Sequence, residues 1–186
     1  MNFSVARPEV VRAVNQRWLL KFWKEQLGAH RVPQWRAINT ENLSRMSENL
    51  SFLDVTGVGD ALRFHIRFHG ALIGRAYGSV DCRGKYLDAV IPASRHKEKL
   101  APYHHTVAAG CPVYTIYDVT DRAGRVVHYE RLLLPFASNG MAVDRILASF
   151  EFVCLEGGFD GDALMQSQSA APALRLSVQI ETHEPA

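Results

Sequence analysis

The chain contains few cysteines and none of the patterns in which cysteine staples a fold or binds zinc. Its 186 residues include three, Cys82, Cys111 and Cys154. An odd number without a CxxC pair does not suit a disulfide framework or a zinc finger. A domain of about 150 residues buries roughly 70% of its unfolded surface and needs no such staple. The cysteines therefore predict a reducing, cytoplasmic compartment.

Long hydrophobic runs and a strong charge of one sign are also missing. Arg7, Glu9, Arg12 and Arg17 occupy the N-terminal stretch in which a signal peptide needs apolar residues. No uncharged apolar run approaches the ~20 residues that span a bilayer. The formal net charge is only +2, and Lys and Arg are scattered along the chain. We therefore expect neither a membrane nor nucleic acid as a partner.

Catalytic motifs are absent as well. The sequence has no GxSxG elbow, HExxH, Walker loop or GxGxxG. It also lacks a kinase core, a GGDEF-like segment and a helix-turn-helix. Acidic pairs such as Glu130 with Glu151 are expected on the outer face of adjacent strands, as solvated charges. We therefore predict that the protein is not an enzyme and that it acts through a partner.

The segments that are present show clear periodicity. Apolar residues at helical spacing predict a helix from Pro8 to Leu27. A strand is expected at 49–55. The next strand, 61–70, alternates strictly, which predicts a wet face with His65 and His69 and a core face with Leu62, Phe64, Ile66 and Phe68.

The second half contains a helix and three more strands. Residues 71–91 predict short helical turns, and a longer helix is expected from about Ser94 to Ala109, ended by Gly110. Strands are expected at 113–120, 126–136 and 144–154.

This order predicts an α+β fold, in which a five-stranded antiparallel sheet carries a helical crossover on one face and follows an N-terminal amphipathic helix. We expect a helix and connector over 1–44, one domain over 45–155, and a flexible tail over 156–186. One segment of the tail alternates between apolar and polar residues, with apolar Leu174, Leu176, Val178 and Ile180. The alternative to a flexible tail is therefore a late strand that is added to a neighbour's edge.

Four separated segments resemble those of PAS domains, and more closely the small single-PAS-domain proteins of alphaproteobacteria. They are the helix with Trp18 and Trp23, "RFHIRFHG", "GKYLDAV" and "HYERLLLPFASNGMAVDRILA". The resemblance implies a PAS-like fold over 45–155 and a sensory role in signal transduction, through a small metabolite, a signalling protein, or both. The alternative is an enzyme of the ketosteroid-isomerase sort, which needs a carboxylate facing an apolar cavity.

The stretch "SVDCRGKYLDAV" raises the question of a flavin light sensor, because LOV-class PAS domains present a reactive cysteine in a motif similar to "GRNCRFLQG". Here "GKYLDAV" occupies the matching helix, so Cys82 precedes it, and Asp81 replaces the Asn. Residues 113–136 contain no Asn or Gln to bind a flavin ring edge. We therefore predict a loop thiol at Cys82 and no flavin.

Histidines also raise the question of a metal or haem. His65 and His69 lie about 13 Å apart on a strand, too far to share a metal ion. Haem-binding PAS sensors take their ligand from the crossover helix, which makes His104 a candidate. Its neighbour His105 points ~100° away, so only one of the two can face a cavity. We predict no metal and no cofactor, and a His104 that lines the core. The alternative is that His104 binds haem.

Strand 126–136 carries polar residues among apolar ones, and its period does not decide which face is inward. One face has Val127, Tyr129, Arg131 and Leu133, and the other has Val126, His128, Glu130, Leu132 and Leu134. An inward Arg131 needs a carboxylate partner or an anionic ligand, because a buried unpaired charge is costly. The candidate ligand-binding residues are His104, Tyr117, Tyr129 and Arg131.

The N-terminal helix has an apolar stripe wider than one packing face requires, which predicts a homodimer. The expected interface residues are Val11, Val14, Trp18, Phe22 and Trp23. The alternative is that the helix folds back and that segment 32–38, with Trp35, covers its second side.

Overall fold

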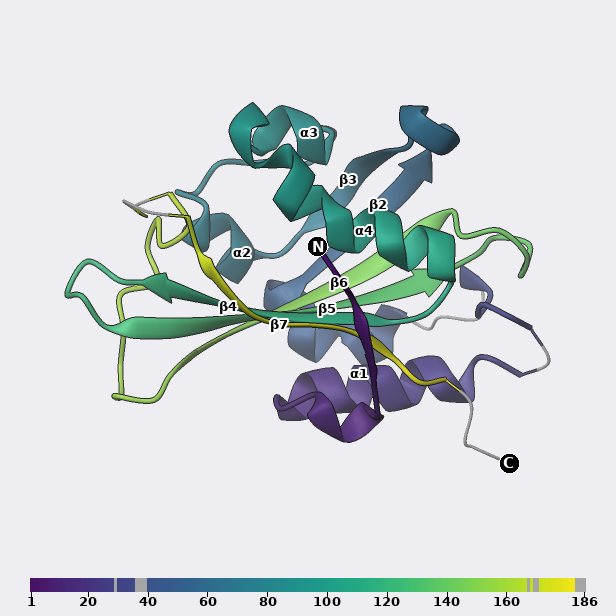
Figure 1. Cartoon of the computed structure of the whole chain (residues 1–186), viewed down its shortest axis with the longest axis horizontal. Coiled ribbons are helices and arrows are strands. Elements are labelled where there is room, and N and C mark those ends of the chain that lie inside the picture. The colour runs from purple at the N-terminus through teal and green to yellow at the C-terminus, as the bar shows by residue number, and fades with distance from the viewer. Residues whose placement is uncertain (29, 36–39, 167, 169–170, 183–186) are drawn as a thin grey trace.

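The computed structural model describes residues 1–28, 30–35, 40–166, 168 and 171–182. Within these residues, seven strands form one sheet in the order β1-β7-β4-β5-β6-β2-β3 (Figure 1). Among these seven strands, β1 and β7 alone pair in parallel, and the other neighbours pair antiparallel. The strands are β1 Ser4–Ala6, β2 Leu50–Thr56, β3 Arg63–His69, β4 Val113–Thr120, β5 Val126–Phe136, β6 Arg145–Cys154 and β7 Ala173–Ile180.

Strands β2 to β6 lie where the alternation of the sequence predicts them, but the expected count of five is wrong. Strand β7 pairs antiparallel with the edge of β4, with Tyr114 opposite Val178, and β1 covers β7. An open β4 edge would leave a row of unpaired backbone groups. Val178 and Ile180 are each 2% exposed, so much of the segment that we expected to be a loose tail belongs to the sheet.

Helical segments cover both faces of the sheet, whereas the sequence led us to expect them on one (Figure 1). On one face lie α1 (Val14–Glu25) and the 3₁₀ segment η3 (Thr40–Asn49). On the other lie α2 (Ala71–Ala76), α3 (Leu87–Val90), η5 (Ala93–Arg95) and α4 (His96–Ala109). Short 3₁₀ turns complete the fold, η1 at Pro8–Val10 and η4 at Gly59–Ala61.

Helix α4 ends at Gly110, whose φ of 63° is the left-handed conformation expected at such an end. Among the described residues, no helix is both long and apolar enough to cross a bilayer.

Strand β5 separates two hydrophobic cores. Val127, Tyr129 and Leu133 face the core under α2 to α4, while Leu132 and Leu134 face the core under α1. The sequence period did not decide which face of β5 is inward, and in the structure both faces are. A strand covered on both faces requires a nearly continuous apolar run, and "LLLPF" provides one.

A β-bulge at Arg67 shifts the phase of β3. Leu53 pairs with Ile66, but the next two residues back along β2 pair with Phe68 and His69, so no residue of β2 lies opposite Arg67 in the register. Phe68 consequently lies on the α1 side of the sheet, and His69 on the α2–α4 side. The strict alternation predicted the reverse, so the expected positions of Phe68 and His69 are wrong.

The acidic pair Glu130 and Glu151 lies between α1 and the sheet rather than in solvent. The two residues are directly opposed on β5 and β6, and Glu130 is 2% exposed. The Tyr114 hydroxyl donates to Glu130 Oε2 at 2.6 Å, and Asn15 and Asn49 donate to the two oxygens of Glu151. Burial, the largest cause, raises the pKa of Glu151. Our expectation of solvated charges is therefore wrong for Glu130.

Candidate functional site: a cationic cavity

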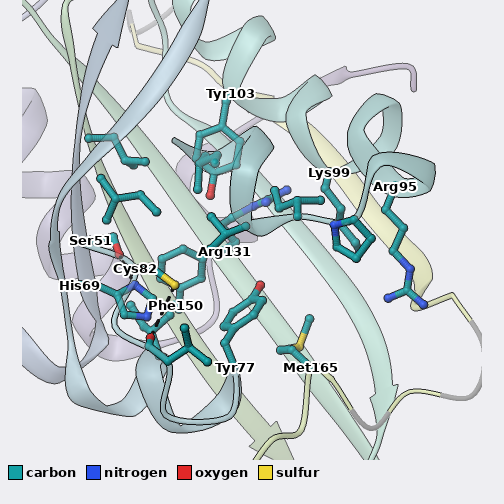
Figure 2. A pocket seen from close by; sticks show the side chains of 18 of the residues that line it. Ser51, His69, Tyr77, Cys82, Arg95, Lys99, Tyr103, Arg131, Phe150 and Met165 are labelled. Atoms are coloured by element: carbon teal, nitrogen blue, oxygen red, sulfur yellow. Dashed lines mark hydrogen bonds between the residues drawn. The ribbon is translucent and has the colours of Figure 1, made fainter. Parts of the chain in front are cut away.

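A cavity of about 510 Å³ lies between the sheet and helices α2 to α4, a size typical of small-molecule sites (Figure 2). Pro92, Ser94 and Gln166, all exposed, lie at its mouth. Most of its wall is apolar, formed by Leu53, Ile66, Ile73, Val80, Cys82, Leu87, Val90, Ile91, Phe150 and Met165.

Arg131, on β5, is the buried charge of this cavity. It is 3% exposed, its Nε donates to Thr115 Oγ1 at 3.3 Å, and its guanidinium lies 4.9 Å from the ring centre of Tyr103. Its Nη2 is buried without a hydrogen-bond partner. Within the described part of the chain, no carboxylate forms an ion pair with it. Because arginine stays protonated, the fold contains an uncompensated buried cation.

A second cation, Lys99 on α4, projects into the same cavity and is 8% exposed. Its Nζ lies 4.0 Å from the ring centre of Tyr117. Glu98 Oε1 is 3.2 Å away, but the two groups lack hydrogen-bond geometry. Burial lowers the pKa of Lys99 to about 8; Glu98 opposes this shift, and Arg131 adds to it. Lys99 and Arg131 therefore line one cavity as two cations that repel one another.

This shift predicts how the stability of the ligand-free protein depends on pH. Between pH 8 and the ordinary lysine value of 10.5, the unfolded chain holds a proton that the folded protein has lost at Lys99. The free energy of unfolding should therefore rise with pH there, by roughly 1–2 kcal/mol between pH 8 and 9.5. Denaturant titrations should show the rise in wild type and in exposed Lys97→Met, but not in Lys99→Met. A wild-type curve as flat as that of Lys99→Met would contradict the shift.

The opposite wall carries His69, Ser51 and Cys82 (Figure 2). Ser51 Oγ lies 3.3 Å from His69 Nδ1, while His69 Nε2 is buried without a hydrogen-bond partner. Burial lowers the pKa of His69, so its ring is neutral near pH 7. Cys82 lies in a loop, as the sequence predicts, but it is buried, and burial raises its pKa. This wall therefore offers a few neutral polar groups, the Ser51 hydroxyl, the His69 ring and the Cys82 thiol, and carries no charge.

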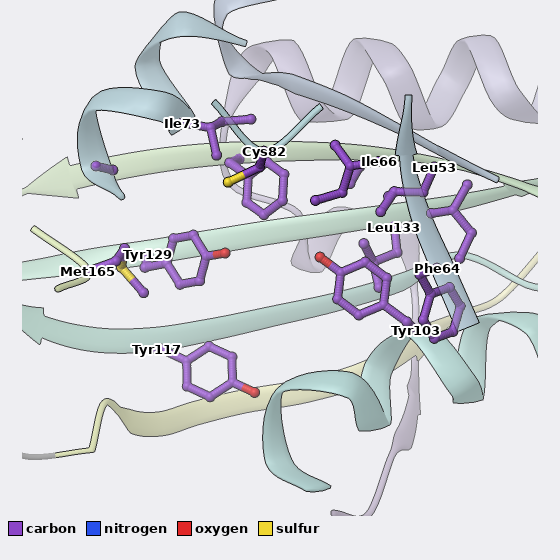
Figure 3. Packing of buried hydrophobic residues seen from close by; sticks show 14 of the residues in the cluster. Leu53, Phe64, Ile66, Ile73, Cys82, Tyr103, Tyr117, Tyr129, Leu133 and Met165 are labelled. Carbon is purple, nitrogen blue, oxygen red and sulfur yellow. The ribbon is translucent and has the colours of Figure 1, made fainter. Parts of the chain in front are cut away.

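Tyrosine hydroxyls form the surroundings of Arg131. Figure 3 shows those of Tyr103 and Tyr129 turned toward one another. Tyr77 Oη lies 3.5 Å from Tyr129 Oη, and Tyr117 Oη is buried without a partner. Burial raises the pKa of Tyr77, Tyr117 and Tyr129, so all three stay neutral donors.

Comparison with known families agrees with this architecture. The family model described as PAS domain matches residues 11–150, most of the chain. The chain belongs to the PAS domain family. No curated protein matches the sequence. The match begins at Val11, so it includes helix α1. From the sequence we had expected the PAS domain to begin at residue 45.

The PAS domain brings together some of the residues that the sequence singled out. Arg131 lines the cavity, and Tyr117 and Tyr129 lie on the same face in the layer behind it. His104 is not among the lining residues; its ring packs edge-on against Phe64 at 5.1 Å. Tyr103, one residue earlier on α4, takes the inward position, because adjacent helical residues point ~100° apart.

Sequence reasoning missed Lys99, Tyr103, Tyr77 and His69. Lys99 and Tyr103 stand four residues apart, which places them on one face of α4. That spacing was a usable signal once the inward face was known.

Proposed function

We propose that the protein is a sensory PAS module of cytoplasmic signal transduction, which binds a small molecule in the cavity and acts on a protein partner without catalysis of its own. Membership of the PAS family supports the regulatory role. The cavity between sheet and helices supports ligand binding.

One observation carries the proposal, namely the unpaired buried guanidinium of Arg131. Burying a charge without a partner costs several kcal/mol, and protein interiors avoid it. A ligand that meets Arg131 would recover that free energy on binding. The cavity is thus best explained as a site whose charge balance is completed from outside the chain.

The sheet also offers a route by which occupancy reaches the other face. Arg131 points into the cavity, while its neighbour Glu130 points toward α1. Gln16 of α1, which is fully buried, donates to the backbone oxygens of Glu130 and Ser149 at 3.4 and 3.1 Å. A shift of β5 on ligand binding would therefore change the position of α1 on the sheet.

Native mass spectrometry of protein purified without denaturation tests the proposal. Wild type should carry an extra small mass that is lost on denaturation, and Arg131→Met should carry much less of it. The control is Arg63→Met, which removes a partly exposed arginine paired with Asp88. A wild-type mass equal to that of the bare chain, or occupancy unchanged in Arg131→Met, would contradict the proposal.

The partner surface that we propose is the outer face of α1, bound to a second copy of the chain. Two of the residues predicted for this interface are excluded, because Val11 and Trp23 are fully buried in the core under α1. Val14 is 71% exposed, and Trp18, 42% exposed, stacks on Phe22 at 5.4 Å. Of segment 32–38, residues 36–38 lie outside the described part.

Replacing Trp18 with serine is expected to shift the dimer toward monomer, because exposed aromatic residues are frequent interface anchors. Analytical ultracentrifugation of wild type, Trp18→Ser and the helix control Lys21→Ser measures this shift. Wild type and Lys21→Ser should sediment alike, and Trp18→Ser more slowly. A monomeric wild type at micromolar concentration would rule the dimer out. Deleting α1 is unsuitable as a test, since it would open the core beneath that helix.

A further inference from the structure

We infer that the ligand of this cavity is an organic anion with a single carboxylate and an apolar body. The inference rests on the proposed function, because it specifies the chemistry of the molecule that the cavity binds. It is supported by the distribution of charge over the cavity wall.

Two cationic hydrogen-bond donors determine which group of the ligand binds at this end of the cavity. Arg131 Nη2 and Lys99 Nζ, from β5 and α4, are both buried and both without a hydrogen-bond partner. A carboxylate has two acceptor oxygens, one for each donor, and such charge-assisted hydrogen bonds are about twice as strong as neutral ones. None of the residues that line the cavity in the described chain is Asp or Glu. Arg131 therefore has no carboxylate of the described chain beside it, and Lys99 has only that of Glu98, 3.2 Å away.

One carboxylate fits this end better than a more highly charged group. The Nε edge of Arg131 is already bonded to Thr115, which leaves part of the guanidinium fork for a ligand. Lys99 adds a single ammonium and already lies beside Glu98. Arg95 stands at the mouth, next to solvent. The buried charge available is thus close to that of one carboxylate.

Away from the mouth, where Arg95 stands, the rest of the cavity in the described chain has no charge to pair with a second one on the ligand. The apolar end away from the two cations carries Ile73 and Cys82, and the imidazole of His69 beside Cys82 is neutral (Figure 2). A second carboxylate would lie in this apolar end without a counter-charge, which is costly. His69 Nε2, without a partner, leaves room for one neutral polar group on the ligand. The remainder of the body must be hydrocarbon.

Calorimetric titration with matched pairs tests the inference: octanoate against octanol, and 3-phenylpropionate against 3-phenylpropanol. At least one acid should bind the ligand-free protein at least 10-fold more tightly than its alcohol. Suberate, with two carboxylates, should bind more weakly than octanoate. Arg131→Met should weaken the acid by about 10- to 100-fold, as expected for loss of a charged hydrogen bond. Arg63→Met should leave the affinity unchanged.

The pH dependence of binding supplies a further readout. Affinity for the acid should fall as the pH rises through 8, where Lys99 loses its proton, and the fall should be absent in Lys99→Met. Equal binding of acid and alcohol, or binding of the alcohols alone, would overturn the carboxylate while leaving the cavity a ligand site. Failure of both acids would overturn it as well. If, in addition, native mass spectrometry finds no retained mass, the proposed function fails too.

Discussion

Replacing Arg131 with methionine is expected to stabilise the ligand-free protein by about 1–3 kcal/mol, although it alters a residue that is only 3% exposed. Most substitutions of buried residues destabilise. Here the native side chain is a cation with an unpaired Nη2 and a second cation, Lys99, nearby. Methionine keeps much of the volume, removes the uncompensated charge and ends the repulsion.

Urea unfolding of ligand-stripped wild type and Arg131→Met measures this gain. The control Arg63→Met should lower the free energy of unfolding by no more than about 1 kcal/mol, because it removes a partly exposed ion pair and a contact with the Tyr86 ring. Saturating ligand should narrow the difference by about 1.4–2.7 kcal/mol, because wild type binds it 10- to 100-fold more tightly than Arg131→Met does. A marked loss of stability in ligand-free Arg131→Met would show that the guanidinium has a counter-charge within the folded chain.

Replacing Val178 with aspartate is expected to lower the free energy of unfolding by about 3–5 kcal/mol. Val178 lies opposite Tyr114 on β7 and is 2% exposed in the core under α1. The carboxylate would be placed among apolar side chains with no partner. Leu174→Asp is the matched control, because Leu174 belongs to the same strand and is 44% exposed.

Equilibrium unfolding in urea distinguishes the two variants, and Leu174→Asp should remain within about 1 kcal/mol of wild type. Equal losses in both variants would contradict the position of β7 in the sheet. Limited proteolysis gives the same distinction: the segment 173–180 should resist cleavage in Leu174→Asp and be trimmed in Val178→Asp.

The sequence predicted strands β2 to β6 well because each has alternating or continuous apolar residues between clear turns. Strand β7 was harder, because Leu174, Leu176, Val178 and Ile180 alternate within a stretch whose composition resembles a linker. Strand β1 has three residues, too few for any periodic signal. Whether such segments form strands depends on the edge that they meet, which is a tertiary property.

The site was only partly predictable, for similar reasons. Arg131 stood out as a charge inside an apolar strand, but the period of β5 cannot give its direction when both faces are covered. His69 was misplaced because one bulged residue, Arg67, reverses the faces beyond it. His104 was proposed and Tyr103 was overlooked, because the rotation of α4 about its axis is set by packing, not by residue type.

The contents of the cavity beside Arg131 test the central claim most directly. A high-resolution crystal structure of protein purified without denaturation would show them. We expect a bound small molecule with one carboxylate whose oxygens lie within hydrogen-bonding distance of Arg131 Nη2 and of Lys99 Nζ, and a hydrocarbon body along the apolar wall near Cys82. A carboxylate of the chain itself, such as that of Glu98, bonded to Arg131 Nη2 in a cavity without ligand would contradict the account.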